Sequence, residues 1–269
     1  MSAALLFDLD DTLISDEHAA EAAFRATAEH GACSRELDAA ALAQAAREHA
    51  QGLWRATPVY DYCRAIQISS WEALWCRFEG EDPRIAWLRA WSPEYRRETW
   101  RLALARQGID DDALAFELGE RYGNERRLLH ETFADVAEAL DGLAVDHALG
   151  LVTNGASCLQ REKLAASGLA GRFAAVVVSG EVGVGKPDPA IFAHALEALG
   201  ADAADAVMVG NSLAHDVAGA RAAGMRAVWV NRFGHERPAD DALVEVHDLL
   251  DLRGALAMPP PGVEPGFAA

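Results

Sequence analysis

The chain has 269 residues, 51% of them hydrophobic, so it is long enough for one large or two medium domains with a packed core. Its 42 acidic residues outnumber 24 basic ones and give a formal charge of -18, which argues against nucleic acid or an anionic membrane as partner. We find no leader-like segment and no apolar run of about 18 residues, and therefore expect a cytoplasmic protein without a membrane span. The cysteines lack zinc-site or disulfide-framework spacing and are expected to be reduced core thiols: Cys33, Cys63, Cys76 and Cys158.

A short apolar run at residues 3–7 predicts a strand that is buried on both faces. Acidic residues follow it at once, with Asp8 and Asp10 two positions apart. Because ligands bind at the carboxyl ends of strands in open α/β sheets, both carboxylates are expected to face one small site. Their mutual repulsion calls for a cation, and hard carboxylate oxygens suit Mg²⁺. The alternative interpretation is an acidic loop that caps a strand or begins a helix.

Residues 15–132 are rich in Ala, Arg and Trp at helical spacing, which predicts an all-helical domain inserted after the first strand. We expect this block to cover the carboxyl edge of the sheet as a lid. The expected helices are 17–30 ended by Gly31, 38–51 ended by Gly52, one from an N-cap at Ser92 and Pro93 to Gly108, and one that starts at residues 110–112.

After residue 133 predicted helices and strands alternate, which indicates a mostly parallel sheet with right-handed crossovers. The expected strands are 148–152, 174–178, 206–209 and 227–230, and the expected helices are 134–143, 157–167, 189–199 and 213–223. The predicted fold class is therefore α/β, a Rossmann-like parallel-sheet core with an inserted all-helical cap. The expected boundaries are 1–14 and 133–258 for the core, 15–132 for the cap and 259–269 for an irregular Pro/Gly-rich tail.

Polar residues also follow the second predicted strand, where Thr153, Asn154 and Gly155 lead into a helix. The threonine hydroxyl and the backbone N–H groups near a helix start can cradle a phosphoryl group, and glycine allows a ligand to approach the backbone. An ordinary turn with a helix cap is the alternative.

Lys186 precedes Pro187 and a helix that begins with proline, so it can serve as a fixed point charge for a phosphate. A solvated surface lysine is the alternative. The neighbouring glycines approach the spacing of a P-loop, but Pro187 stands where a hydroxyl must bind Mg²⁺, and we reject that interpretation. Farther on, Asn211 and Asp216 follow a strand expected beside the first one. They could complete a metal site with Asp8 and Asp10, or cap the next helix.

In this order, the four segments resemble the four motifs of the haloacid dehalogenase superfamily. The segments are residues 7–13 (Phe-Asp-Leu-Asp-Asp-Thr-Leu), 153–155 (Thr-Asn-Gly), 185–189 (Gly-Lys-Pro-Asp-Pro) and 210–216 (Gly-Asn-Ser to Asp). Four ordered motifs are far more specific than any single one. The helical insertion after the first motif is similar to the cap of the subfamily that includes phosphoglycolate phosphatase and N-acylneuraminate-9-phosphatase.

The resemblance implies a phosphatase that passes through an aspartyl-phosphate. Asp8 would be the nucleophile, and Asp10 would protonate the leaving alcohol and then deprotonate the attacking water. The expected phosphate-binding residues are Thr12, Thr153, Asn154, Gly155 and Lys186. The resemblance places Mg²⁺ on the carboxylate of Asp8, the backbone carbonyl of Asp10 and the fourth motif, where Asn211 and Asp216 are the expected ligands.

One departure from the family pattern is Asn211, because phosphatases of the superfamily usually carry aspartate there. The loss of one charge is expected to weaken Mg²⁺ binding. It also leaves two other hypotheses open: a metal-independent 2-haloacid dehalogenase, against which the acid at Asp10 argues, and a non-catalytic binding protein derived from a phosphatase. A mutase or phosphotransferase is a closer variant, distinguished by an acceptor other than water.

The expected partner is a small phosphorylated metabolite, and the chain is expected to be a monomer or a homodimer. The cap would set specificity, although most of its aromatic residues are expected to pack in the cap interior. The candidate specificity residues are Arg47, Trp54, Arg55, Arg64, Trp71, Trp75, Trp87, Trp91 and Trp100. The sequence does not choose among nucleotides, sugar phosphates and carboxylated phosphates.

Overall fold

The computed structural model describes residues 4–257 and divides into two compact units. Among the described residues, the core unit comprises 4–14, 132–154 and 167–257, and the cap unit comprises 15–131 and 155–166. The predicted boundaries place residues 155–166 in the core, whereas their contacts group them with the cap helices. The predicted tail at 259–269 lies outside the described residues. Within residues 4–257, no helix is both long and apolar enough to cross a lipid bilayer.

The core unit contains a six-stranded parallel sheet with the order β3-β2-β1-β4-β5-β6, which confirms the predicted fold class. The strands are β1 (Ala4–Phe7), β2 (Ala148–Thr153), β3 (Ala175–Val178), β4 (Ala206–Gly210), β5 (Arg226–Val230) and β6 (Val244–Val246). β1 lies between β2 and β4, and Phe7 is in register with Leu151 and Val209. The loops that carry the first, second and fourth predicted motifs therefore leave the adjacent strands β1, β2 and β4 at one edge of the sheet, where the strand order reverses.

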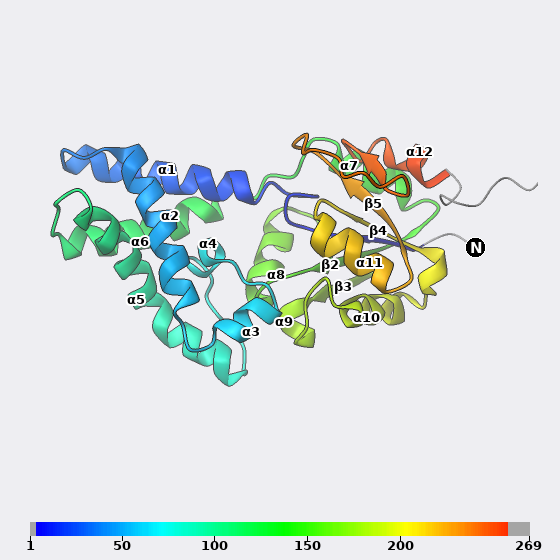
Figure 1. Cartoon of the computed structure of the whole chain (residues 1–269), viewed down its shortest axis with the longest axis horizontal. Helices are drawn as coiled ribbons and strands as arrows, with labels where there is room; N and C mark the ends of the chain where they lie inside the picture. The colour runs from blue at the N-terminus through cyan, green and yellow to red at the C-terminus, as the bar shows by residue number, and fades with distance from the viewer. Residues whose placement is uncertain (1–3, 258–269) are drawn as a thin grey trace, which may run out of the picture. The chain divides into compact units, whose positions relative to one another are not determined.

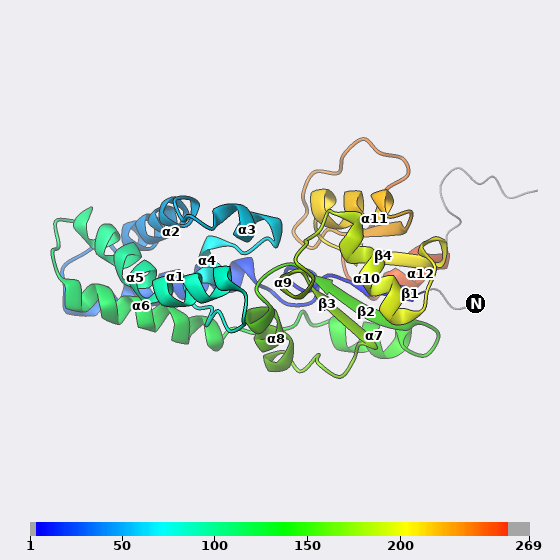
Figure 2. The ribbon, with the colours of Figure 1, turned by 90° about the horizontal axis from the view of Figure 1, so that it is seen from below.

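Helices flank both faces of this sheet, and Figures 1 and 2 show α7 and α11 on opposite sides of it. The core helices are α7 (Val136–Leu143), α9 (Ser179–Val182), α10 (Pro189–Leu199), α11 (Ala218–Ala222) and α12 (Leu252–Ala257), with a 3-10 turn η1 (Ala203–Asp205) and a π-helical turn η2 (Leu213–Val217). Leu6, Met208 and Trp229 of the strands pack with Ile191 and Phe192 of α10 in one buried cluster. Burial of this apolar surface fixes the strand ends that carry the polar motifs.

The cap unit is helical, as the residue spacing predicts. Its helices are α1 (Glu17–Ser34), α2 (Ala39–Arg55), α3 (Tyr60–Ala65), α4 (Ser70–Ala73), α5 (Pro83–Ala105), α6 (Asp112–Arg127) and α8 (Ser157–Ala166). Aspartates cap three of them: the side chains of Asp38, Asp82 and Asp111 accept hydrogen bonds from first-turn amides. The largest aromatic side chains form the interior, where Trp54, Trp75 and Trp100 are buried, as expected.

Three predicted helix boundaries in the cap are wrong. α1 continues through Gly31 and α2 through Gly52, so neither glycine ends its helix. α5 begins at Pro83 after Asp82, and Pro93 lies inside it rather than at its start. Ser92 therefore is not an N-cap, and its hydroxyl donates to the carbonyl oxygen of Arg89. Burial of the apolar side chains of these helices outweighs the tendency of glycine and proline to end a helix.

The four cysteines are free thiols, as the spacing predicts. Cys63 and Cys76 are buried and Cys158 is half-buried, but Cys33 is exposed, so the prediction of a core position is wrong for Cys33. That residue lies in the last turn of α1, just before the chain turns toward α2.

Candidate active site

Asp8 follows β1 directly and is 7% exposed. Its backbone N–H donates to the carbonyl oxygen of Val209 at 3.0 Å, which extends the pairing of β1 with β4 by one residue. The chain then turns tightly, since the carbonyl oxygen of Leu9 accepts from the N–H groups of Leu13 and Ile14 at 2.9 and 3.1 Å. Asp11 takes a left-handed conformation with φ 56° in this turn. The loop therefore keeps Asp8 at the sheet edge, and half-buried Asp10 lies two residues farther along in the same loop.

Lys186 extends its ammonium group to the same place. Its Nζ atom lies 2.6 Å from Oδ1 of Asp8 and 2.7 Å from Oδ1 of Asp216, and its side chain is 2% exposed. The alternative of a solvated surface lysine is therefore wrong. Asn154 holds the lysine backbone on both sides: its Oδ1 accepts from the N–H of Lys186 at 2.8 Å and its Nδ2 donates to the carbonyl oxygen at 3.1 Å. Residues of all four motifs thus meet at Lys186.

The electrostatics of this cluster follow from burial and from its unequal charges. Burial and the Asp216 carboxylate raise the pKa of Asp8 from an ordinary 3.8 to about 7, although Lys186 opposes the rise. Burial disfavours the charge on Lys186, but the carboxylates of Asp216 and Asp8 outweigh it and raise the pKa of the ammonium group. Lys186 therefore stays charged, and the site has one more carboxylate than cation.

The carboxylate of Asp216 is held in place by the backbone at the start of the fourth motif. The backbone N–H of Ser212 donates to its Oδ2 at 2.9 Å. Gly210 leaves room for this carboxylate, because a Cβ atom there would lie 2.3 Å from Oδ2. Its Oδ1 atom is buried and lies 2.7 Å from Nζ of Lys186. A buried carboxylate oxygen has a second lone pair, so it is a suitable ligand for a cation.

Thr12 and Asn211 contact each other. The hydroxyl of Thr12 donates to Oδ1 of Asn211 at 3.2 Å and accepts from the Asn211 backbone N–H at 3.0 Å. Thr12 is completely buried, so its hydroxyl joins the first motif to the fourth. In this arrangement Thr12 orients Asn211, and its role in phosphate binding stays a prediction.

The second motif is split between the two units. Thr153 is completely buried at the end of β2, in register with Val178 of β3. Gly155 belongs to the cap unit. Its φ is 136°, and a Cβ atom would lie 2.5 Å from Nε2 of Gln160, so both the backbone and the packing require glycine there.

The donor types at the core site fit Mg²⁺, which binds carboxylate, carbonyl and amide oxygens. Asp8 and Asp216 supply carboxylates and Asn211 supplies an amide oxygen. Within residues 4–257, no group of three or more His, Cys, Asp or Glu side chains is arranged to hold a metal. A magnesium site here would therefore depend on neutral oxygens in addition to two carboxylates.

Sequence reasoning missed two residues that support the loops. The indole N–H of Trp229 donates to the carbonyl oxygen of Asn211 at 2.8 Å. Arg232 donates to the carbonyl oxygen of Thr12 at 3.0 Å and pairs with both carboxylate oxygens of Asp135 at 3.0 and 2.9 Å. The available signal was position, since Arg232 lies two residues after the end of the fifth strand, at the same sheet edge.

The comparisons with known proteins agree with this geometry. The haloacid dehalogenase-like hydrolase family matches residues 3–224. A phosphoserine phosphatase of Thermus thermophilus is 42% identical over 232 residues, which cover 85% of this chain and 88% of that protein. An N-acylneuraminate-9-phosphatase of Rattus norvegicus is 38% identical over 145 residues, or 52% of this chain and 58% of that one.

Solved structures with the same arrangement include a HAD hydrolase of Bacillus subtilis bound to magnesium and a 2-haloacid dehalogenase of Pseudomonas syringae. The first has a TM-score of 0.63 at 25% identity, and the second has a TM-score of 0.60 at 29% identity. Each comparison covers 96% of this chain and 99% of the other. The motifs, the sheet order and these matches lead to one conclusion: the chain belongs to the haloacid dehalogenase-like hydrolase family.

Proposed function

We propose that this hydrolase is a Mg²⁺-dependent phosphatase that cleaves small phosphomonoesters through an aspartyl-phosphate on Asp8. The observation that carries the proposal is the Lys186 ammonium 2.6 Å from Asp8 and 2.7 Å from Asp216 at the carboxyl edge of the sheet. Phosphoryl transfer depends mainly on positioning and on neutralising charge. A fixed cation beside a nucleophilic carboxylate supplies both.

In the first step, a carboxylate oxygen of Asp8 attacks phosphorus while the bond from phosphorus to the alcohol oxygen breaks. Asp10 gives a proton to that oxygen, so the alcohol leaves neutral. Lys186 neutralises the phosphoryl oxygens, and Asn154 keeps the lysine backbone in place. Thr153 and the backbone at Gly155 are assigned to phosphate binding, as the motif resemblance implies.

In the second step, water attacks phosphorus after Asp10 takes its proton, and the bond from phosphorus to Asp8 breaks. The carboxylate returns and inorganic phosphate leaves. The oxygens that would hold Mg²⁺ belong to Asp8, the Asp10 backbone, Asn211 and Asp216. The bound ion would supply Lewis-acid neutralisation of the phosphoryl charge.

The substrate is proposed to be a small phosphorylated metabolite. The relative from Thermus thermophilus is named a phosphoserine phosphatase, so phosphoserine is the first substrate to test. The relative named N-acylneuraminate-9-phosphatase adds a sugar-acid phosphate to the panel. A cytoplasmic location and a monomeric or dimeric state stay predictions.

The direct experiment is hydrolysis of p-nitrophenyl phosphate by the purified protein with Mg²⁺ or with EDTA. We expect phosphate release with Mg²⁺, little with EDTA, and none from Asp8→Asn in either condition. Release by Asp8→Asn at the wild-type rate would refute the proposed nucleophile.

A 2-haloacid dehalogenase is the second candidate, favoured by neutral Asn211 and by the structural likeness to the Pseudomonas syringae protein. It would release chloride from 2-chloropropionate without metal and leave p-nitrophenyl phosphate intact. A non-catalytic protein would do neither.

A further inference from the structure

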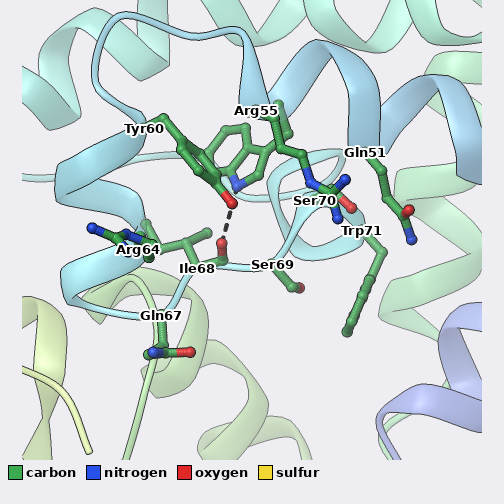
Figure 3. Close-up of a pocket in the computed structure, with 10 residues that line it drawn as sticks. Gln51, Arg55, Tyr60, Arg64, Gln67, Ile68, Ser69, Ser70 and Trp71 are labelled. Carbon is green, nitrogen blue, oxygen red and sulfur yellow. Dashed lines mark hydrogen bonds between the residues drawn. The ribbon is translucent and has the colours of Figure 1, made fainter.

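The cap unit contains a pocket of about 260 Å³, the cap pocket, beneath the ends of two consecutive helices (Figure 3). Its polar and aromatic lining includes Gln51 and Arg55 of α2, Tyr60 and Arg64 of α3, and Ser69 and Trp71 of the segment that forms α4. Residues four positions apart share one helix face, so each of the two helices contributes a pair of side chains. The pocket lies entirely within the cap unit.

Hydrogen bonds fix the frame of the cap pocket. The indole N–H of buried Trp54 donates to the carbonyl oxygen of Ile68 at 3.0 Å. The hydroxyl of Tyr95 donates its one hydrogen to the carbonyl oxygen of Ser70 at 2.8 Å and lies 3.1 Å from that of Ala50, which ties α2 to the start of α4. A pocket that is already formed loses little conformational entropy when a ligand binds.

The charges around the cap pocket are positive and largely uncompensated. The side chain of Arg55 forms no ion pair or hydrogen bond within residues 4–257. Among the same residues, no Asp or Glu lines the pocket. Arg64 pairs with Asp61 only at 3.8 Å, with the two side chains 71% and 96% exposed, and such a pair contributes little. By contrast, Arg47 and Arg97 of the same unit each pair with two carboxylates.

A carboxylate fits these groups better than a phosphate. The planar guanidinium of Arg55 can donate two parallel hydrogen bonds to a carboxylate, and Gln51 and Tyr60 carry further donors. Arg55 is the last residue of α2, and the helix dipole repels negative charge at that end of the helix. This repulsion is stronger for a phosphate dianion than for a carboxylate monoanion. The first-turn amides of α4 are not available to a phosphate, because Glu72 and Ser69 form a capping box there.

We propose that the cap pocket binds the carboxylate group of a small organic acid, with Arg55 as its main partner. The carboxylate has two possible sources, the substrate itself or a separate metabolite. The first source rests on the proposed phosphatase function, whereas carboxylate binding itself does not. The tests below separate the two sources.

Binding is measured first, without any reaction, as the rise in melting temperature on addition of sodium acetate, L-serine or D-glycerate, with acetamide as the neutral control. Arg55→Gln removes the charge from the pocket, and we expect it to raise the apparent Kd about tenfold or more. Arg25→Gln is the matched control, because Arg25 is an exposed arginine of α1 that also lacks a partner among the described residues and does not line the pocket. It should bind like the wild type, and Arg55→Lys should fall between the two.

Hydrolysis then identifies the source of the carboxylate. Phosphoserine and phosphoethanolamine differ by one carboxylate, so the ratio of their kcat/KM values reports its recognition. If the substrate supplies the carboxylate, Arg55→Gln lowers this ratio about tenfold, mainly through the KM for phosphoserine. If a separate acid supplies it, the binding assay responds to Arg55→Gln and the ratio does not.

The proposal is overturned if Arg55→Gln changes neither the carboxylate-induced melting shift nor the kcat/KM ratio. Failure of the proposed function would be seen differently, as wild-type protein that hydrolyses no phosphomonoester. The melting experiment would then still decide whether the cap pocket binds carboxylates.

Discussion

The chain has only two lysines, Lys163 and Lys186, and both are buried, one in each unit. Each ammonium group lies between two carboxylates. In the core unit, Lys186 contacts Asp8 and Asp216 at 2.6 and 2.7 Å. In the cap unit, Lys163 contacts Asp16 and Glu72 at 2.8 and 2.7 Å. All the other residues in the count of lysines and arginines are arginines. A compact side-chain ammonium group is therefore present only at these two places.

The two clusters differ in charge balance. Arg126 adds a second cation to the cap cluster, 2.6 Å from Asp16, and so balances its two carboxylates. The core cluster has one cation for two carboxylates. The pKa values follow this difference: despite burial, Lys163 and Arg126 lower the pKa of Asp16 to about 2, whereas burial raises that of Asp8 to about 7. A balanced cluster stabilises a fold, whereas an unbalanced one leaves charge for a ligand.

The largest effect is expected from Lys163→Met, which would leave two buried carboxylates with one cation. We expect the free energy of unfolding to fall by about 3–5 kcal/mol, because an uncompensated buried charge is costly. Urea denaturation measures this loss. Lys163→Arg is the companion variant in case Lys163→Met does not fold, and a loss below about 1 kcal/mol for Lys163→Met would show that the cap cluster is not structural.

Lys186→Met should act on activity instead. It removes the cation that neutralises the phosphoryl oxygens, and we expect kcat/KM for p-nitrophenyl phosphate to fall about 100- to 1000-fold. Circular dichroism and the melting temperature check that the variant is folded. A folded variant that retains wild-type activity would remove the proposed distinction between the two lysines.

The cap cluster also predicts a pH dependence of stability. The pKa of Asp16 is lowered in the folded state, so its stabilising effect is complete above its ordinary value of 3.8 and is lost as the pH falls toward about 2. Roughly 2 kcal/mol is at stake. The stability difference between wild type and Asp16→Asn should therefore shrink between about pH 6 and about pH 3 in urea titrations. An unchanged difference would contradict the assignment.

Asn211→Asp should give the smallest effect. It adds a carboxylate to the core cluster and is expected to tighten Mg²⁺ binding roughly tenfold. The Mg²⁺ concentration that gives half-maximal hydrolysis measures the change. An unchanged concentration would mean that residue 211 does not reach the metal.

Local signals were enough to predict both ends of a helix where an N-cap residue and a C-terminal glycine indicate the same boundaries. α10 begins after Asp188 with Pro189 and ends before Gly200, which has φ 61°, as the sequence predicts. In the cap such signals failed, because side chains from distant helices decide the outcome. Gly31 lies within a well-packed part of α1, where a Cβ atom would be 3.4 Å from Leu118. Packing against the neighbouring helix therefore keeps Gly31 helical, although glycine often ends a helix.

The candidate site shows the same limit. The order of strands and motifs was sufficient to place Asp8, Lys186 and Asp216 near one another. The sequence could not show that Asn154 holds the backbone of Lys186 or that Thr12 binds Asn211, because side-chain partners depend on the loops in three dimensions. The cap cluster also escaped prediction, since Asp16 and Lys163 are far apart in the chain. The presence of only two lysines was the available signal.

The most direct test of the account is to find which aspartate carries the phosphoryl group during turnover. Protein quenched in acid while it hydrolyses p-nitrophenyl phosphate is digested and examined by mass spectrometry after borohydride reduction, which marks an acyl phosphate. The account predicts modification of Asp8 in the unbalanced core cluster and none of Asp16 in the balanced cap cluster. Modification of a different residue, or continued turnover by Asp8→Asn, would contradict it.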